Sequence, residues 1–197
     1  MNNKIFYTCK YTPLELFEGF GTECVKLDPV CTDYECSEGC AHPNLCGYGK
    51  GVIELVEKGG VNALILTDCC DVMRRVYDVL KNRMKTGFIY LLTLPHKAGQ
   101  AEAKLFARNL ERLIEAGGEY TGREFSCEAA DKALREGRFD EGTDRPEGPH
   151  ISLEGAHGGS ALTDHIRPVF ELPVYDNTCS GYRRVRPDEE IKEGSRD

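Results

Sequence analysis

Cysteine is concentrated in one stretch of this 197-residue chain. Six of the ten cysteines lie between residues 31 and 71, at Cys31, Cys36, Cys40, Cys46, Cys69 and Cys70. Thiolates bind soft metal ions and iron–sulfur clusters, and they undergo redox reactions. In a reducing compartment such a density indicates metal ligation or redox chemistry rather than a disulfide framework.

Two motifs place a cysteine where a loop leads into a predicted helix. Residues 42–48 read His-Pro-Asn-Leu-Cys-Gly-Tyr, and residues 67–75 read Thr-Asp-Cys-Cys-Asp-Val-Met-Arg-Arg. The N-terminus of a helix offers free N–H groups and the positive end of the helix dipole, and both favour a thiolate. Cys46 and Cys70 are therefore candidate metal ligands.

Composition excludes several classes of partner. The formal net charge is −8, which argues against nucleic acid or an anionic membrane surface as a partner. No apolar run approaches the roughly 18–20 residues that span a bilayer. The N-terminus lacks the long apolar region of a signal peptide, so we expect a cytoplasmic protein without a membrane partner.

The hydrophobic pattern predicts alternating strands and helices. Apolar runs predict strands at residues 4–8, 23–27, 63–66 and 88–94, and helical periodicity separates them. The run at 63–66 is apolar throughout, as in a parallel strand buried on both faces. This order predicts an α/β fold with a parallel, doubly wound sheet of the Rossmann or flavodoxin-like kind.

We predict five segments. Residues 1–97 form an α/β cluster-binding domain, and residues 98–139 form a helical extension with helices near 100–116 and 123–136. Residues 140–149 form a linker rich in Asp, Glu, Gly and Pro. Residues 150–182 form an incomplete second α/β unit, and residues 183–197 form a flexible charged tail.

The parallel topology brings several cysteines to one edge of the sheet. Cys9 follows the first predicted strand, Cys69 and Cys70 follow the third, and His96 follows the fourth. Ligands of open parallel sheets bind at the carboxyl ends of the strands, where the following helices begin. Ligands drawn from separate strand ends suit an iron–sulfur cluster in a cleft.

Zinc is the competing interpretation for the loop that precedes Cys46. Structural zinc sites contain short cysteine spacings. The loop contains Cys31, Cys36 and Cys40, with His42 close by, and this set is a possible extra site. Cys24 and Cys127 lie in ordinary element patterns, and we interpret them as buried apolar side chains.

Four segments together resemble the 2-hydroxyacyl-CoA dehydratase and benzoyl-CoA reductase family, which includes the double-cubane cluster proteins. They are Cys-Lys-Tyr-Thr-Pro-Leu-Glu at 9–15, His-Pro-Asn-Leu-Cys-Gly-Tyr-Gly-Lys at 42–50, Cys-Asp-Val-Met-Arg at 70–74 and Tyr-Asp-Asn-Thr-Cys-Ser-Gly-Tyr-Arg at 175–183. The second and fourth are the most specific.

The resemblance implies an oxygen-sensitive iron–sulfur protein that belongs to a lyase or a low-potential reductase. Family members hold a [4Fe-4S] cluster or a double cubane between two α/β domains. An ATP-dependent activator iron–sulfur protein supplies single electrons, and in the dehydratases an acyl-CoA substrate loses water through a ketyl radical. The resemblance assigns ligand roles to Cys9, Cys46, Cys70 and Cys179, with Cys69 as the alternative to Cys70.

The second unit suggests a partner. Family members continue through more of a second domain, so we expect a truncated, split or degenerate member. An apolar face at Val169, Phe170, Leu172 and Val174 predicts a homodimer or a chain that completes the second domain. Two functions follow: a component of the enzyme, or an accessory, non-catalytic module for metal binding or electron transfer.

Overall fold

Four parallel strands form the main sheet of this computed structural model, which describes residues 4–84, 87–141 and 145–184. The strands are β1 (Lys4–Tyr7), β2 (Glu23–Lys26), β3 (Ala63–Thr67) and β4 (Phe88–Leu92). Their spatial order is β2-β1-β3-β4, and every pair is parallel. The predicted parallel α/β fold is confirmed. The predicted flexible tail lies, from residue 185 onward, outside the described residues.

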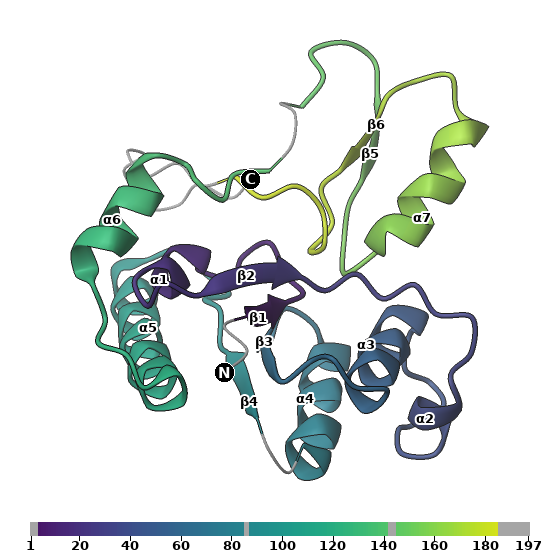
Figure 1. Ribbon diagram of the computed structural model, residues 1–197. Helices are drawn as coiled ribbons and strands as arrows, with labels where there is room; N and C mark the ends of the chain where they lie inside the picture. Colours follow the sequence, from purple (N-terminus) through teal and green to yellow (C-terminus); the bar gives the residue numbers. More distant parts are fainter. Residues whose placement is uncertain (1–3, 85–86, 142–144, 185–197) are drawn as a thin grey trace.

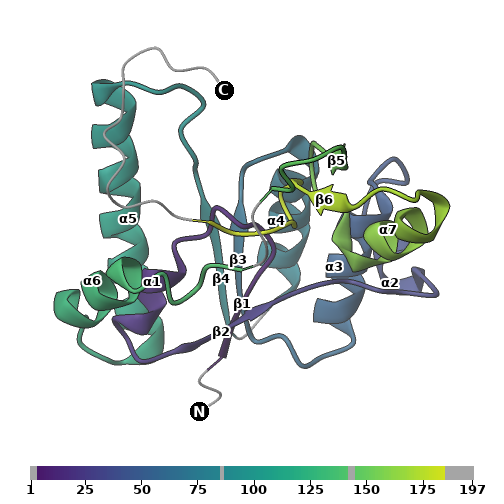
Figure 2. The same ribbon diagram turned by 90° about the horizontal axis from the view of Figure 1, so that it is seen from above.

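Helices cover both faces of this sheet (Figure 1, Figure 2). α3 (Gly47–Glu57) and α4 (Asp71–Arg83) pack on one face, and α1 (Leu14–Glu18) and α5 (Gln100–Thr121) pack on the other. All five residues of β3 are buried because both of its faces are covered. The core therefore consists of two apolar layers that hold the strand ends in place.

One additional helix and two helical boundaries differ from the prediction. The loop predicted before Cys46 contains a short helix, α2 (Glu35–Glu38), and α5 continues beyond residue 116. α6 (Cys127–Arg135) begins later than predicted, because the Ser126 side chain caps it by accepting a hydrogen bond from Ala129 N at 3.2 Å.

The second unit is a small βαβ structure. It comprises β5 (Ile151–Leu153), α7 (Gly159–Ile166), the 3₁₀ helix η1 (Arg167–Val169) and β6 (Val174–Asp176), and its two strands are parallel. β6 starts directly after Pro173. Proline has no N–H for a strand ladder, although its carbonyl accepts a hydrogen bond from Ile151 N at 2.9 Å.

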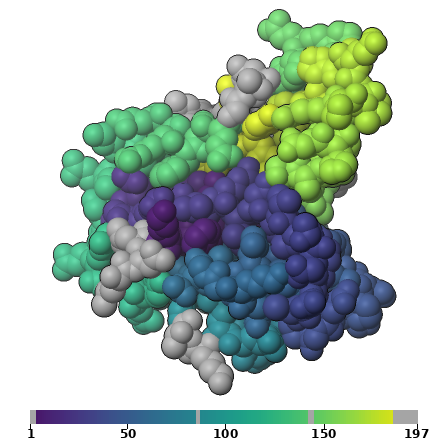
Figure 3. Space-filling model, turned by 45° about the vertical axis from the view of Figure 1, so that its right-hand side comes forward, coloured from purple at the N-terminus to yellow at the C-terminus, as the bar shows by residue number. Residues whose placement is uncertain are grey.

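The second unit is attached to the first by buried polar contacts, and it forms a lobe on the first part of the chain (Figure 3). Both oxygens of the Glu15 carboxylate accept hydrogen bonds from Arg183 Nη2 at 2.8 Å. Ser160 N, near the start of α7, donates to the Asp28 carboxylate at 3.0 and 3.2 Å. These contacts hold the loops of the second unit over the carboxyl ends of the main strands.

The predicted apolar face of the second unit is largely exposed. Val169 is 72% exposed, Phe170 45% and Leu172 42%, whereas Val174 is half buried because it lies in β6. Exposed apolar clusters of this kind mark interaction surfaces. In the described part of the chain, no helix is long and apolar enough to cross a membrane.

Candidate metal centre

Two adjacent strands of the main sheet are each followed by cysteines. β1 ends at Tyr7 and is followed by Cys9, which is completely buried. β3 ends at Thr67 and is followed by Cys69 and Cys70. Because β1 and β3 are neighbours in the sheet, the two loops leave it side by side. Cys70 is the N-cap residue of α4, and Asp71 lies in its first turn.

The second unit supplies two further groups from its own strand ends. His157 follows β5, and Cys179 follows β6. Cys179 N donates to the carbonyls of Gly155 and Ala156 at 3.2 and 3.3 Å, which joins the two loops. Lys10 N donates to Cys179 O at 2.7 Å and thereby ties the Cys179 loop to the residue after Cys9.

The closest group of potential ligands combines both units. The ligand atoms of Cys9, Cys69 and His157 all lie within 4.8 Å of one another. The Nδ1 atom of His157 is 4.0 Å from the Cys69 sulfur. The imidazole stacks on the ring of Tyr48, with centroids 4.7 Å apart, and the Tyr48 hydroxyl donates to Leu27 O at 3.0 Å. The ring of His157 is therefore held in one orientation.

Hydrogen bonds between the thiols of this group lower the pKa of two of them and raise the pKa of the other two. Hydrogen bonds from Cys179 and then Cys69 lower the pKa of the Cys9 thiol to about 3. Hydrogen bonds from Cys179 and then Cys70 lower the pKa of Cys69 to about 5. The pKa values of the two thiols that donate these hydrogen bonds rise: that of Cys70 to about 12, and that of Cys179 as well. Two thiolates, held by two thiol donors, suit metal ligation.

His157 carries the compensating positive charge in the metal-free group. Burial is the largest single effect on its pKa and lowers it, but interactions with the sulfurs of Cys69 and Cys70 together outweigh burial and raise the pKa to about 9. Because the folded pKa exceeds the ordinary 6.5, the resulting stabilisation is complete below about pH 6.5 and is lost as the pH rises through about 9.

Replacing Cys69 and Cys70 by Ser should lower the pKa of His157 from about 9 toward 6.5 or below, because burial then acts without its opposing thiolates. Titration of the imidazole nuclear magnetic resonance signals in metal-free protein measures this. Cys127→Ser is the matched control: the prediction that Cys127 is buried is wrong, and its thiol is exposed on α6. An unchanged pKa in the double variant would show that the sulfurs do not set it.

The residues present fit a thiolate-ligated metal. The Nε2 atom of His157 is buried and has no hydrogen-bond partner among the described residues. A buried, unpaired ring nitrogen beside thiolates is costly without a metal or a proton to bind. The group is compact: a tetrahedral ion with sulfur and nitrogen ligands holds them about 3.5–4 Å apart. A cubane holds its cysteines further apart, since they bind different irons.

The structure places the other predicted ligands apart from this group. Cys46 is the N-cap of α3, but its side chain is exposed and makes no capping hydrogen bond. His42 accepts a hydrogen bond from Asn44 N at 3.2 Å within its own turn. His96 is exposed in the loop after β4. The remaining predicted extra ligands surround α2: Cys31, Cys36 and Cys40.

His157 is the member of the site that the sequence did not single out as a ligand. The rule that selected Cys9 and Cys69, a ligand at the carboxyl end of a parallel strand, also selects His157 when it is applied to the strand at 151–153.

Arg74 and Arg75, in the first turns of α4, are engaged in ion pairs. Arg74 contacts Asp68 at 3.4 Å, and Arg75 contacts Asp71 at 3.8 Å and Asp78 at 3.3 Å. The Asp68 carboxylate in turn accepts a hydrogen bond from Leu94 N at 2.8 Å. Arg74 therefore supports the loop that carries Cys69.

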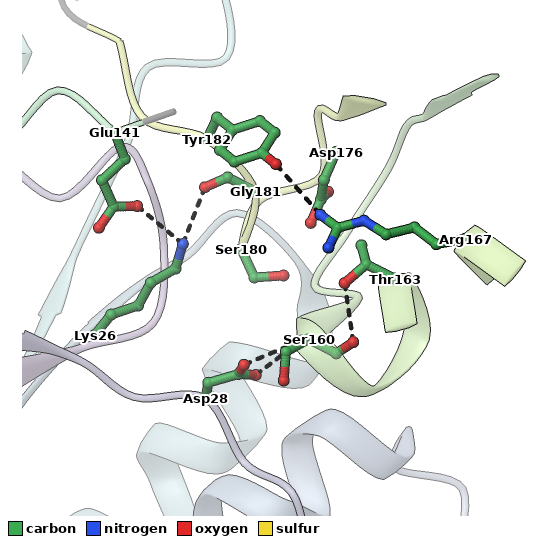
Figure 4. A pocket seen from close by; sticks show the side chains of 10 residues that line it. All are labelled: Lys26, Asp28, Glu141, Ser160, Thr163, Arg167, Asp176, Ser180, Gly181 and Tyr182. Carbon is green, nitrogen blue, oxygen red and sulfur yellow. Dashed lines mark hydrogen bonds and ion pairs between the residues drawn. The ribbon is translucent and has the colours of Figure 1, made fainter. Parts of the chain in front are cut away.

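A polar pocket of about 340 Å³ lies at the seam between the two units (Figure 4). The Lys26 ammonium donates to Glu141 Oε2 and to Gly181 O, both at 3.1 Å. Arg167, from the other wall, donates to the hydroxyl of Tyr182 at 3.4 Å. Ser180 lines this pocket next to Cys179 in the chain, so the pocket adjoins the thiol group.

Fold and site define the class: an α/β protein whose strand ends gather thiols and an imidazole into a candidate metal centre. The family model for 2-hydroxyglutaryl-CoA dehydratase, D-component, matches residues 9–138, more than half of the chain. The chain belongs to this family, and the predicted family is confirmed. No curated protein matches the chain. The matched region includes Cys9, Cys46, Cys69 and Cys70 and ends before the second unit.

Proposed function

We propose that this chain is the iron–sulfur cluster-binding component of a 2-hydroxyacyl-CoA dehydratase-type system. The observation that carries this proposal is the meeting of Cys9, Cys69, Cys70 and Cys179 from three strand ends at the junction of the two units. Family membership supports the dehydratase-type system. Soft thiolates drawn from separate elements are the ligands of iron–sulfur clusters.

We propose Cys9, Cys69 and Cys179 as ligands. The sequence pattern favoured Cys70, but the sulfur in the compact group is that of Cys69, while Cys70 donates a hydrogen bond to it. The first unit carries Cys9 and Cys69 and the second carries Cys179, so the proposed ligands come from both units. When bound, the cluster supplies low-potential one-electron chemistry. The thiols of this chain would hold the cluster. Lys10, whose N–H donates to Cys179 O, keeps the Cys179 loop beside the cluster position.

The partners follow from the family. We propose an ATP-dependent activator as the electron donor and an acyl-CoA thioester as the substrate class. A homodimer, or a chain that completes the second domain, stays our prediction for the exposed face at Val169, Phe170 and Leu172. An exposed apolar face gains stability when it is covered.

A second candidate function is a non-catalytic module that binds one metal ion, such as zinc. The compact spacing of Cys9, Cys69 and His157 favours it, because these ligand atoms already lie within 4.8 Å of one another. Such a centre would stabilise the junction between the units without transferring electrons.

Metal analysis of protein purified without oxygen separates the two candidates. The cluster predicts brown protein with broad thiolate-to-iron absorption, and iron and acid-labile sulfide in similar amounts. Protein that takes up no iron or sulfide during anaerobic reconstitution, and that holds a zinc ion which Cys9→Ser loses, would decide for the single-ion module.

A further inference from the structure

Three cysteines outside the strand-end group surround one face of α3. Cys31 precedes α2, Cys36 lies within it, and Cys40 follows it. α2 packs on the outer side of α3, away from the main sheet (Figure 1, Figure 2). None of the three is in the compact group around Cys9.

Two of these thiols lie one helical turn apart along α3. The Cys31 sulfur is 3.8 Å from Gly51 O, and Ser37, the residue after Cys36, donates its N–H to the Glu54 carboxylate at 2.7 Å. Positions 51 and 54 share one face of the helix. A Cβ atom at Gly51 would lie 2.8 Å from Pro29 Cβ, so glycine permits the loop that carries Cys31 to approach α3 this closely.

The third thiol, that of Cys40, lies one turn after Cys36. The Cys40 thiol donates to Cys36 O at 3.1 Å. Cys36 and Cys40 are four residues apart across a helical turn, since Cys40 N donates to Ser37 O at 3.2 Å. Side chains at this spacing are neighbours on one side of the turn, as in helical metal-binding motifs.

The side chain at the centre of this group is a buried carboxylate. The Glu54 side chain has 0% exposure. Its Oε1 atom accepts a hydrogen bond from Ser37 N at 2.7 Å, whereas Oε2 has no hydrogen-bond partner among the described residues. The nearest cation is Lys58 Nζ, 3.6 Å from Oε2 and half exposed. A buried carboxylate oxygen that accepts no hydrogen bond indicates a site where a cation can bind.

Two cations lie beside this group, and each pairs with a carboxylate. Lys58 pairs with Asp33 at 2.7 Å, and Arg83 pairs with Glu57 at 2.8 Å. Metal binding would displace the thiol protons.

We propose that Cys31, Cys36, Cys40 and Glu54 bind a single zinc ion in a tetrahedral structural site that holds the 30–44 segment on α3. No three of these four ligand atoms lie within 4.8 Å of one another in the described part of the chain. Binding therefore draws the thiols inward through rotation of their side chains to zinc–sulfur distances of about 2.3 Å.

Cobalt titration of the full-length chain tests this site in the absence of the other one. In a variant with Cys9, Cys69, Cys70 and Cys179 replaced by Ser, one cobalt(II) should bind with sulfur-to-cobalt charge transfer and tetrahedral visible bands, and zinc should displace it. Adding Cys36→Ser should abolish the charge-transfer absorption. Glu54→Gln should weaken binding by about 10–100-fold, as changes around metal ligands do.

Cys24→Ser is the matched control, because Cys24 is a partly buried thiol on β2 that belongs to neither group. Circular dichroism of the metal-free variants checks that they fold. If the fourfold variant does not fold, wild-type protein should bind one cobalt more than Cys36→Ser does. Equal cobalt binding with and without Cys36, or binding without charge transfer, would overturn the zinc site.

The proposed cluster and the proposed zinc site are tested by separate measurements, so either proposal can be wrong without the other. Iron and sulfide in Cys36→Ser, measured in the otherwise unchanged chain, report on the proposed cluster alone. Cobalt binding to the variant without strand-end thiols reports on the Cys31–Cys36–Cys40 group alone.

Discussion

Replacing Cys9 by Ser is expected to lower the iron and sulfide content by about tenfold or more. Cys9 has no exposed surface and is the thiol whose pKa falls furthest, to about 3, because Cys179 and Cys69 donate hydrogen bonds to it. A serine hydroxyl is a hard, weakly acidic group and a poor ligand for iron in a thiolate site. Since loss of a supporting residue already costs 10–100-fold in metal affinity, loss of a ligand should cost at least as much.

The measurement is iron and acid-labile sulfide per chain after anaerobic reconstitution. Cys127→Ser is the control, because its thiol is exposed on α6 and should leave both values unchanged. Full metal content in Cys9→Ser would remove the strand-end group as the cluster site. Cys46→Ser tests separately whether Cys46 is a ligand. Its exposed sulfur could bind the cluster only if it moved toward the strand-end thiols, and an unchanged iron content would exclude Cys46 as a ligand.

Glu15→Gln is expected to lower the free energy of unfolding by about 3 kcal/mol or more. The Glu15 and Arg183 side chains are 10% and 4% exposed, and both carboxylate oxygens accept hydrogen bonds from Arg183 at 2.8 Å. Removing one partner of a buried ion pair leaves the other charge desolvated and costs about 3–5 kcal/mol. Asp140, 3.7 Å from Arg183, offsets only part of this loss.

Urea unfolding of the metal-free protein gives the difference. Glu23→Gln is the matched control: its ion pair with Lys4 is 45–58% exposed, so the cost should stay below about 1 kcal/mol. The double variant Glu15→Met, Arg183→Met should recover much of the lost stability, since no charge stays buried. Glu15→Gln with wild-type stability would show that this pair does not attach the second unit.

Local sequence determined the elements. The unbroken apolar run at 63–66 predicted a strand covered on both faces, and β3 is buried at every position. Gly59 and Gly60 end the pattern of α3, and both adopt positive φ angles of 90° and 98°, which glycine accepts without strain. Periodicity and turn residues act over a few residues, so they can be read without knowledge of the remaining structure.

Tertiary structure decided which side chains meet. The strand order β2-β1-β3-β4 makes β1 and β3 neighbours, and this brings Cys9 to Cys69 across 60 residues of sequence. The start of α4 at Asp71 makes Cys70 the cap and leaves Cys69 in the group. His157 joins them only because the second unit docks through contacts such as Arg183 with Glu15, 168 residues apart. Such pairings depend on packing between distant segments, and no local pattern in the sequence encodes them.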